Sequence, residues 1–317
     1  MRKFLAMFIC AALALGLCGC AGESAESGEG TVRIVTTLFP AYDFARQIGG
    51  ERVTVTLLVP PGTESHSFEP TARDMLRIQS CDLFFCNGGE SEAWVEELLD
   101  SGHKINSLVM LQCVEALEEE EKEGMQRIFE EEHGDHEEEE GPEYDEHVWT
   151  SPVKARQICE ALCDSLCALD PEGEGQYREN LAAYSEELTR LDGAFRQTVA
   201  EGEHSTVIFA DRFPARYFVE EYGLDYYAAF PGCAEDTEPS ARTVAFLIDK
   251  VRQEQLPAVF YIEFSNEKMA DVIREDTGCL KLLFHSCHNV SAEELAAGVS
   301  YLGLMEQNVS ALKEALG

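Results

Sequence analysis

His147 lies where a long acidic segment ends and a helix is predicted to begin. Ser151 is a favourable N-cap and Pro152 suits the first position of a helix, so the helix should start about one turn after the histidine. An imidazole held in this way is a candidate metal ligand. Residues 115–146 contain 17 acidic residues and two basic ones, with His133 and His136 among the carboxylates. This segment should attract cations.

Four further residues with metal-binding side chains follow predicted strands. His66 lies in the loop after the second strand, and Asp211, Glu263 and His285 each follow a strand in the second half of the chain. Open α/β sheets bind ligands outside the carboxyl ends of their strands. These four residues and His147 therefore all fall at the edge where a binding site is expected.

Simpler roles remain open for the individual residues. His66 taken alone could be a surface histidine, Asp211 could form an ion pair with Arg212, and Glu263 could cap a helix. The acidic segment could be a solvated charge run. Because its like charges repel, residues 118–142 are expected to be mobile.

The elements that must position these residues alternate between apolar, β-branched runs and amphipathic stretches. This βαβ alternation predicts parallel sheets flanked by helices, an α/β fold. In the first half, strands are predicted at 32–38, 53–59, 82–86 and 107–111, and helices at 41–48, 71–79 and 92–99. A helix at 152–169 follows, and after Asp170-Pro171 a long helix runs from about 173 to 200.

The second half repeats the pattern. Strands are predicted at 205–209, 225–230, 258–262 and 280–284, and helices at 214–222, 240–255, 267–276 and 292–315, the last beginning at a capping box on Ser291. The expected organisation is an N-terminal α/β lobe (31–172), a linking helix (173–201) and a similar C-terminal lobe (202–317).

The N-terminus has the features of an export signal. Arg2 and Lys3 precede a short apolar run that ends in Leu17-Cys18-Gly19-Cys20. This ending resembles a bacterial lipobox, which implies that residues 1–20 are a lipoprotein signal, cleaved before Cys20 so that the thiol of Cys20 carries the lipid. Residues 21–30 are rich in Gly, Ser and Glu, as expected of a flexible tether. The expected location is outside the cytoplasm, anchored by lipid to the cell membrane.

Charge and cysteine content exclude some classes of protein. The formal net charge of −36 makes nucleic acid an unexpected partner. Of the 12 cysteines, Cys10 and Cys18 leave with the signal and Cys20 would carry lipid, so the odd remainder does not form a closed disulfide framework. Cys159, Cys163 and Cys167 recur every four residues, which favours small apolar side chains buried along one face of a helix over a cysteine metal cluster.

Several motifs together resemble the zinc- and manganese-type substrate-binding lipoproteins of ABC importers. They include Phe39-Pro40-Ala41-Tyr42-Asp43, the Pro-Pro-Gly-Thr-Glu run before His66, and Asp145-Glu146-His147-Val148-Trp149 after an acidic, histidine-bearing loop. The resemblance covers nearly the whole mature chain. It implies two α/β lobes joined by a long rigid helix, one metal ion bound in the cleft between them, and delivery of that ion to a membrane permease. It also implies that His66 and His147 are ligands.

The second lobe departs from the family pattern. The family's third ligand follows the first strand of that lobe, and here the corresponding residues are Ala210 or Arg212, neither of which binds metal. Where relatives carry Asp after the last strand, this chain has Phe284-His285-Ser286-Cys287, so the resemblance places His285 in the site. His288 is the alternative within the same segment, which could also be a structural turn or a compact site with Cys287.

Three neutral imidazoles, with Asp211, Glu263 or water as the fourth ligand, suit Zn²⁺ better than Mn²⁺, which favours more oxygen donors. The predicted function is capture of a divalent metal by a monomeric, non-enzymatic protein that passes it to an ABC permease. The alternatives are a zinc-dependent hydrolase, which would need a positioned general base, and an adhesin or metal-buffering surface lipoprotein.

Overall fold

The computed structural model describes residues 31–64, 68–100, 102, 104–126, 143–232, 234 and 239–317. The predicted signal and tether, His66, and residues 127–142 of the acidic segment lie outside these ranges, so the predictions for them stay predictions. None of the helices in the described ranges is long and apolar enough to cross a membrane.

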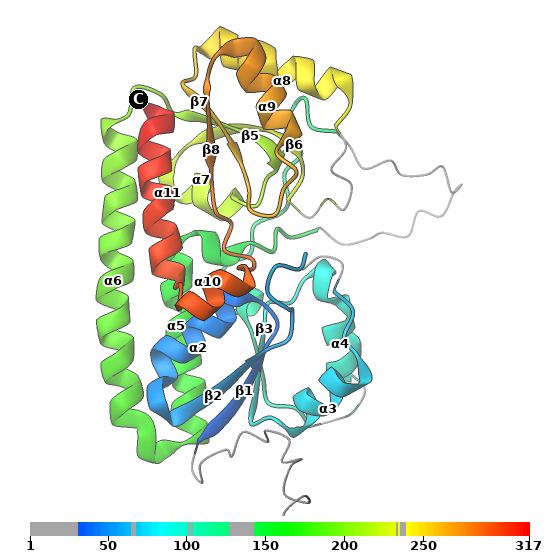
Figure 1. Ribbon diagram of the computed structural model, residues 1–317. Coiled ribbons are helices and arrows are strands. Elements are labelled where there is room, and N and C mark those ends of the chain that lie inside the picture. Colours follow the sequence, from blue (N-terminus) through cyan, green and yellow to red (C-terminus); the bar gives the residue numbers. More distant parts are fainter. Residues whose placement is uncertain are drawn as a thin grey trace, which may run out of the picture. The chain divides into compact units, whose positions relative to one another are not determined.

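The first half of the described chain builds a four-stranded parallel sheet in the order β2-β1-β3-β4 (Figure 1). Its strands are β1 (Val32–Thr36), β2 (Val53–Leu57), β3 (Leu83–Cys86) and β4 (Ser107–Val109), and its helices are α2 (Phe39–Gly49), α3 (Ala72–Ser80) and α4 (Ala93–Asp100). Ile34 and Phe85 pack in the same apolar cluster as α2, whereas Val35 and Phe84 pack with residues of α3 and α4. Both faces of the sheet are therefore covered, as the apolar strands require.

The second half repeats this arrangement with the order β6-β5-β7-β8, also parallel. Its strands are β5 (Thr206–Arg212), β6 (Asp225–Phe230), β7 (Ala258–Tyr261) and β8 (Leu280–Leu283), and its helices are α7 (Arg216–Tyr222), α8 (Ala241–Glu254) and α9 (Lys268–Thr277). The two sheets with their helices are called the first and second lobes below. The predicted fold class is confirmed. β5 runs to Arg212, three residues beyond its predicted end, so Asp211 belongs to the strand.

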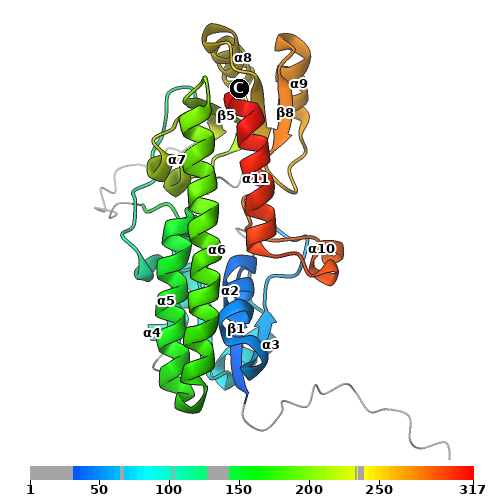
Figure 2. The same ribbon diagram turned by 90° about the vertical axis from the view of Figure 1, so that its left-hand side faces the viewer.

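Two packed helices follow the first lobe, and the second of them reaches the second lobe. α5 (Pro152–Leu169) begins where predicted, with Ser151 accepting a hydrogen bond from the backbone N–H of Lys154, and α6 (Glu174–Glu201) packs along it (Figure 2). At ~1.5 Å per residue, the 28 residues of α6 extend about 42 Å. Tyr184 of α6 contacts Phe44 of the first lobe, and Phe195 contacts Phe218 of the second. One continuous helix is thus fastened to both lobes.

The prediction of a single C-terminal helix over 292–315 is wrong. The chain forms α10 (Ala292–Ala297) and α11 (Tyr301–Leu316) instead. Gly298 ends α10 with φ of +76°, a left-handed conformation that glycine adopts without steric cost. Ser300 then caps α11 by accepting a hydrogen bond from the backbone N–H of Gly303. Apolar periodicity continues through the break, which is why the sequence pattern concealed it.

The prediction that residues 118–142 are mobile is wrong for residues 118–126. Glu118 forms an antiparallel bridge with Tyr144, and the backbone N–H of Gln126 donates to the carbonyl of Ala229 in β6. Lys122 pairs with Asp225 at the start of the same strand. Arg216 of α7 also lies 3.6 Å from Glu120, so a cation of the second lobe offsets part of the repulsion within residues 118–126.

The cysteines of α5 are apolar packing residues, as predicted. Cys159 and Cys163 are fully buried in the main apolar cluster, and Cys167 packs against it partly buried. No two cysteines among the residues of the described ranges form a disulfide.

Replacement of Ser291 by alanine should destabilise the fold by about 1 kcal/mol, because Ser291 and Glu294 form a reciprocal capping box at the start of α10. Urea denaturation of the metal-free protein measures the change. Ser310→Ala is the matched control, since Ser310 is an exposed helical residue whose hydroxyl meets only the carbonyl of Glu306. Equal stability of the two variants would contradict the role of the cap.

Candidate metal centre

His147 is fully buried, and its ring is oriented by Asp145. One oxygen of Asp145 accepts the backbone N–H of His147 at 2.8 Å and lies 3.1 Å from its Nδ1. Because a carboxylate oxygen only accepts, Nδ1 must carry the hydrogen, and the lone pair of the neutral ring is then on Nε2. A carboxylate behind a histidine in this way is the usual support of a metal-binding imidazole.

Both lobes hold the segment that carries His147. In the first lobe, Asn87 donates to the carbonyl of Glu146 at 3.0 Å, and Glu146 Oε1 accepts the backbone N–H of Ser91 at 2.7 Å. From the second lobe, the hydroxyl of Tyr217 donates to the carbonyl of Asp145 at 2.8 Å. These bonds hold the Asp-x-His motif as a rigid unit between the lobes.

The surroundings of His147 act on its pKa in opposite directions. Burial lowers the pKa, whereas the carboxylate of Asp145 raises it through its charge and its hydrogen bond, and the net result is a raised pKa. The ring therefore attracts positive charge even though it is removed from solvent. A metal ion can take the place of the proton at this position.

The segment 285–288, which follows β8, brings a second histidine to His147. The rings of His147 and His288 are 4.6 Å apart between centroids, and Trp149 lies 4.8 Å from His288. The indole N–H of Trp149 donates to the carbonyl of Ser286 at 2.7 Å. The structure thus joins the motif around His147 directly to the turn after β8.

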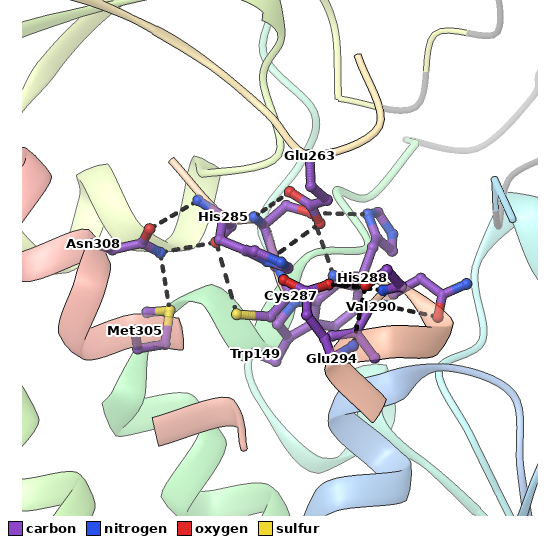
Figure 3. Close-up of polar contacts among 12 residues, drawn as sticks. Trp149, Glu263, His285, Cys287, His288, Val290, Glu294, Met305 and Asn308 are labelled. Atoms are coloured by element: carbon purple, nitrogen blue, oxygen red, sulfur yellow. Dashed lines mark hydrogen bonds and ion pairs between the residues drawn. The ribbon is translucent and has the colours of Figure 1, made fainter. Parts of the chain in front are cut away.

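Glu263, which Figure 3 labels close to His285 and His288, supports this turn through Ser286. Its two oxygens accept the hydroxyl of Ser286 at 2.5 Å and the backbone N–H of Ser286 at 2.7 Å. With its hydrogen donated to Glu263, the Ser286 hydroxyl acts as an acceptor toward Nδ1 of His288, 3.5 Å away. This arrangement places the hydrogen of His288 on Nδ1 and its lone pair on Nε2, which suits a metal ligand.

His285 has the opposite arrangement. Its Nδ1 accepts the backbone N–H of Cys287 at 3.0 Å, a shorter contact than the 3.5 Å to Oε1 of Glu263, and this favours the hydrogen of the neutral ring on Nε2. Asn308 fixes the backbone of His285 on both sides, accepting its N–H and donating to its carbonyl at 2.8 Å each. To bind metal through Nε2, His285 would have to exchange tautomers and break its bond to Cys287.

The other predicted residues lie at the expected sheet edge. Asp211 accepts the backbone N–H of Arg212, and burial raises the pKa of Asp211. The ion pair considered for these two neighbours is absent from the described contacts, because the guanidinium of Arg212 pairs with Glu64 instead. Glu263 caps no helix and uses both oxygens on Ser286.

His288, the alternative to His285 in the sequence analysis, is the histidine of this segment whose ring lies beside His147. Its approach to His147 depends on Cys287, whose φ of +64° turns the chain back so that residue 288 faces the first lobe. A left-handed cysteine leaves no sequence signal comparable to a glycine. Within the described ranges, no three His, Cys, Asp or Glu side chains converge in a way that could hold a metal, and His66 lies outside those ranges.

A buried carboxyl lies behind the site. One oxygen of Glu92 accepts the backbone N–H groups of Asn87 and Gly88 at 3.0 and 2.8 Å. Glu92 also lines a small cavity with Trp94, Glu146 and His288. Burial raises the pKa of Glu92 to about 7, and the charge of Glu146 adds to this.

Two parallel α/β lobes joined by a long helix, with a buried Asp-supported histidine at their junction, are the features of metal-binding substrate-binding proteins. Residues 34–315 match the family described as ZnuA, zinc-uptake complex component A, periplasmic. This chain belongs to that family, and the resemblance stated from its motifs is confirmed.

The relatives support the same assignment. The chain is 31% identical to the high-affinity zinc uptake system protein ZnuA of Bacillus subtilis, over 99% of this chain and 98% of that protein. It is also 31% identical to the zinc-binding lipoprotein AdcA of Streptococcus pneumoniae, over 98% of this chain but only 61% of AdcA.

Solved structures agree in fold. The Zn(II)-bound ZnuA-like domain of Streptococcus pneumoniae AdcA has a TM-score of 0.74 and 28% identity, covering 90% of this chain and 99% of that domain. The metal-dependent lipoprotein YcdH of Bacillus subtilis has a TM-score of 0.75 and 27% identity, with coverage of 90% and 100%.

The buried carboxyl of Glu92 should make stability depend on pH. An unfolded glutamate loses its proton near pH ~4.3, whereas folded Glu92 keeps it up to about 7. Between these values the folded state holds the extra proton, so this contribution to the free energy of unfolding falls as pH rises and levels off above 7. Glu92→Gln should remove it.

Urea denaturation of the metal-free protein at pH 5 and pH 7.5 checks this. The free energy of unfolding of the wild type minus that of Glu92→Gln should decrease by roughly 2–3 kcal/mol between the two pH values. Taking this difference cancels the pH-dependent contribution of the histidines to the free energy of unfolding, because both proteins contain the same histidines. A difference that does not change with pH would contradict the prediction.

Proposed function

We propose that this protein captures Zn²⁺ between its two lobes and delivers it to an ABC permease outside the cytoplasm. The observation that supports the proposal most strongly is the junction of His147 and His288. Each ring has a supporting group at Nδ1, and their centroids lie 4.6 Å apart. Neutral imidazoles with their lone pairs on Nε2 are preferred ligands of Zn²⁺.

The proposed ligands are His147 and His66 from the first lobe and a histidine of segment 285–288 from the second. His285 was predicted for the last position, and the ring geometry favours His288 because of the tautomer that Ser286 and Glu263 impose on it. Water is proposed as the fourth ligand, since Glu263 is engaged through both oxygens and Asp211 by the backbone of Arg212.

We further propose that the protein is a monomer, that a lipid on Cys20 tethers it to the membrane, and that it catalyses no reaction. Ligands drawn from both lobes suit capture and release better than turnover. Glu263, a carboxylate beside this segment, is bonded to Ser286 at both oxygens and is poorly placed to act as the general base that a hydrolase needs.

Metal titration of the purified, metal-depleted protein tests the function. One equivalent of Zn²⁺ should bind tightly and in preference to Mn²⁺, and His147→Ala should lose at least 100-fold in affinity, on the order expected when a buried polar ligand is removed. His204→Ala, a histidine outside the cleft, is the control. Deletion of the gene should impair growth in zinc-limited medium. Normal growth together with hydrolysis of model esters or peptides that depends on metal would favour the enzyme instead.

The choice between the two histidines after β8 has its own experiment. His288→Ala should weaken zinc binding by at least 100-fold, whereas His285→Ala should cost less than tenfold, because the ring of His288, and not that of His285, contacts His147 in the described contacts. Thermal stability without metal separates ligation from folding. The reverse order of the two losses would restore the assignment of His285.

A further inference from the structure

Arg212 occupies the end of β5, the position where the family resemblance leads one to expect a ligand. Its side chain is 9% exposed, and its Nη2 lies 2.6 Å from Oε2 of Glu64, a residue of the first lobe that is 40% exposed. A guanidinium has five donors and no lone pair for a metal. The second lobe therefore presents a fixed positive charge here.

Arg212 adjoins the wall of the site through its neighbour Phe213. A Cβ added to Gly232 would lie 2.8 Å from the carbonyl of Phe213 and 3.0 Å from Cε1 of His147. Backbone of the second lobe thus packs tightly against the ring of His147, and only glycine fits at position 232. The guanidinium of Arg212, the residue before Phe213, extends from this wall to the carboxylate of Glu64.

Glu64 is the last residue of a first-lobe stretch, residues 60–64, that is hydrogen-bonded to the second half of the chain. Asn289 donates from its side-chain amide to the carbonyls of Pro60 and Thr63 at 2.8 and 2.9 Å. The backbone N–H of Gly62 donates to the carbonyl of Val290 at 2.8 Å. Glu64 extends this anchored stretch, two positions before His66 in the sequence.

The charges explain why the pair should matter for metal binding. A buried guanidinium close to a bound divalent cation would repel it unless a carboxylate neutralises the guanidinium. Breaking such a pair from the carboxylate side leaves a buried charge without compensation, which costs more than the intact pair contributes. The same bond ties residues 60–64 to the second lobe.

We infer that Arg212 and Glu64 are a positioning pair that holds the two lobes together beside the metal and slows the release of zinc. The inference rests on the proposed function. At the end of β5, the second lobe then supplies an ion pair with the first lobe instead of a metal ligand.

The rate of zinc dissociation, measured with an excess of a fluorescent chelator, tests the pair in the purified full-length protein. Glu64→Gln and Arg212→Gln should each accelerate dissociation by about tenfold, in the range of charge pairs across interfaces. The double variant should be no faster than the faster single variant, because both changes remove the same interaction. Arg212→Lys, which keeps the charge, should stay within about threefold of the wild type.

Asp276→Asn is the matched control, since it breaks the exposed pair with Arg252 away from the site and should leave the rate unchanged. Rates for Glu64→Gln and Arg212→Gln within twofold of the wild type would overturn the inference, as would a double variant whose acceleration is the product of the single ones. If Arg212→Gln does not fold, comparing Glu64→Gln with Arg212→Lys still decides. A wild type that binds no zinc, or binds it as well as His147→Ala does, would refute the proposed function itself.

Discussion

The turn after β8 is the connection on which the rest of the structure depends, because hydrogen bonds from both lobes converge on it. Glu263 and Asn308 hold it to the second lobe, through Ser286 and His285. Trp149 donates to the carbonyl of Ser286, and the backbone N–H of Phe39 donates to the carbonyl of His288. The turn is therefore a shared part of the two lobes.

This constraint has a consequence for how the site is built. A turn fixed at nearly every backbone group has little conformational entropy left to lose when a metal binds, so its histidines are preorganised. The same rigidity sets their tautomers: backbone N–H of Cys287 claims Nδ1 of His285, whereas the Ser286 hydroxyl faces Nδ1 of His288. Two histidines three residues apart thus adopt different tautomers because their hydrogen-bond partners differ.

Electrostatics adds a second constraint. The chain carries a formal net charge of −36, yet the described site contains the buried cationic side chain of Arg212 beside a wall that touches His147. Carboxylates at a distance attract cations in general, whereas Glu64 and Asp145 act by direct contact with Arg212 and His147. The overall charge therefore favours the arrival of a cation, and we propose that the paired local charges govern how it is held.

The amino-acid sequence by itself determined the α/β class, most of the helices and strands, and the importance of His147, because periodicity, capping residues and the Asp-x-His motif are local signals. It did not separate α10 from α11, since the apolar pattern runs through Gly298. It also did not show that the ring of His288, and not that of His285, lies beside His147, or reveal the partner of Arg212. Those outcomes depend on a left-handed Cys287, on a carboxylate 23 residues away in Glu263, and on a contact across 148 residues to Glu64. Only the tertiary structure decided them, because they arise when groups distant in the chain compete for the same hydrogen bonds and charges.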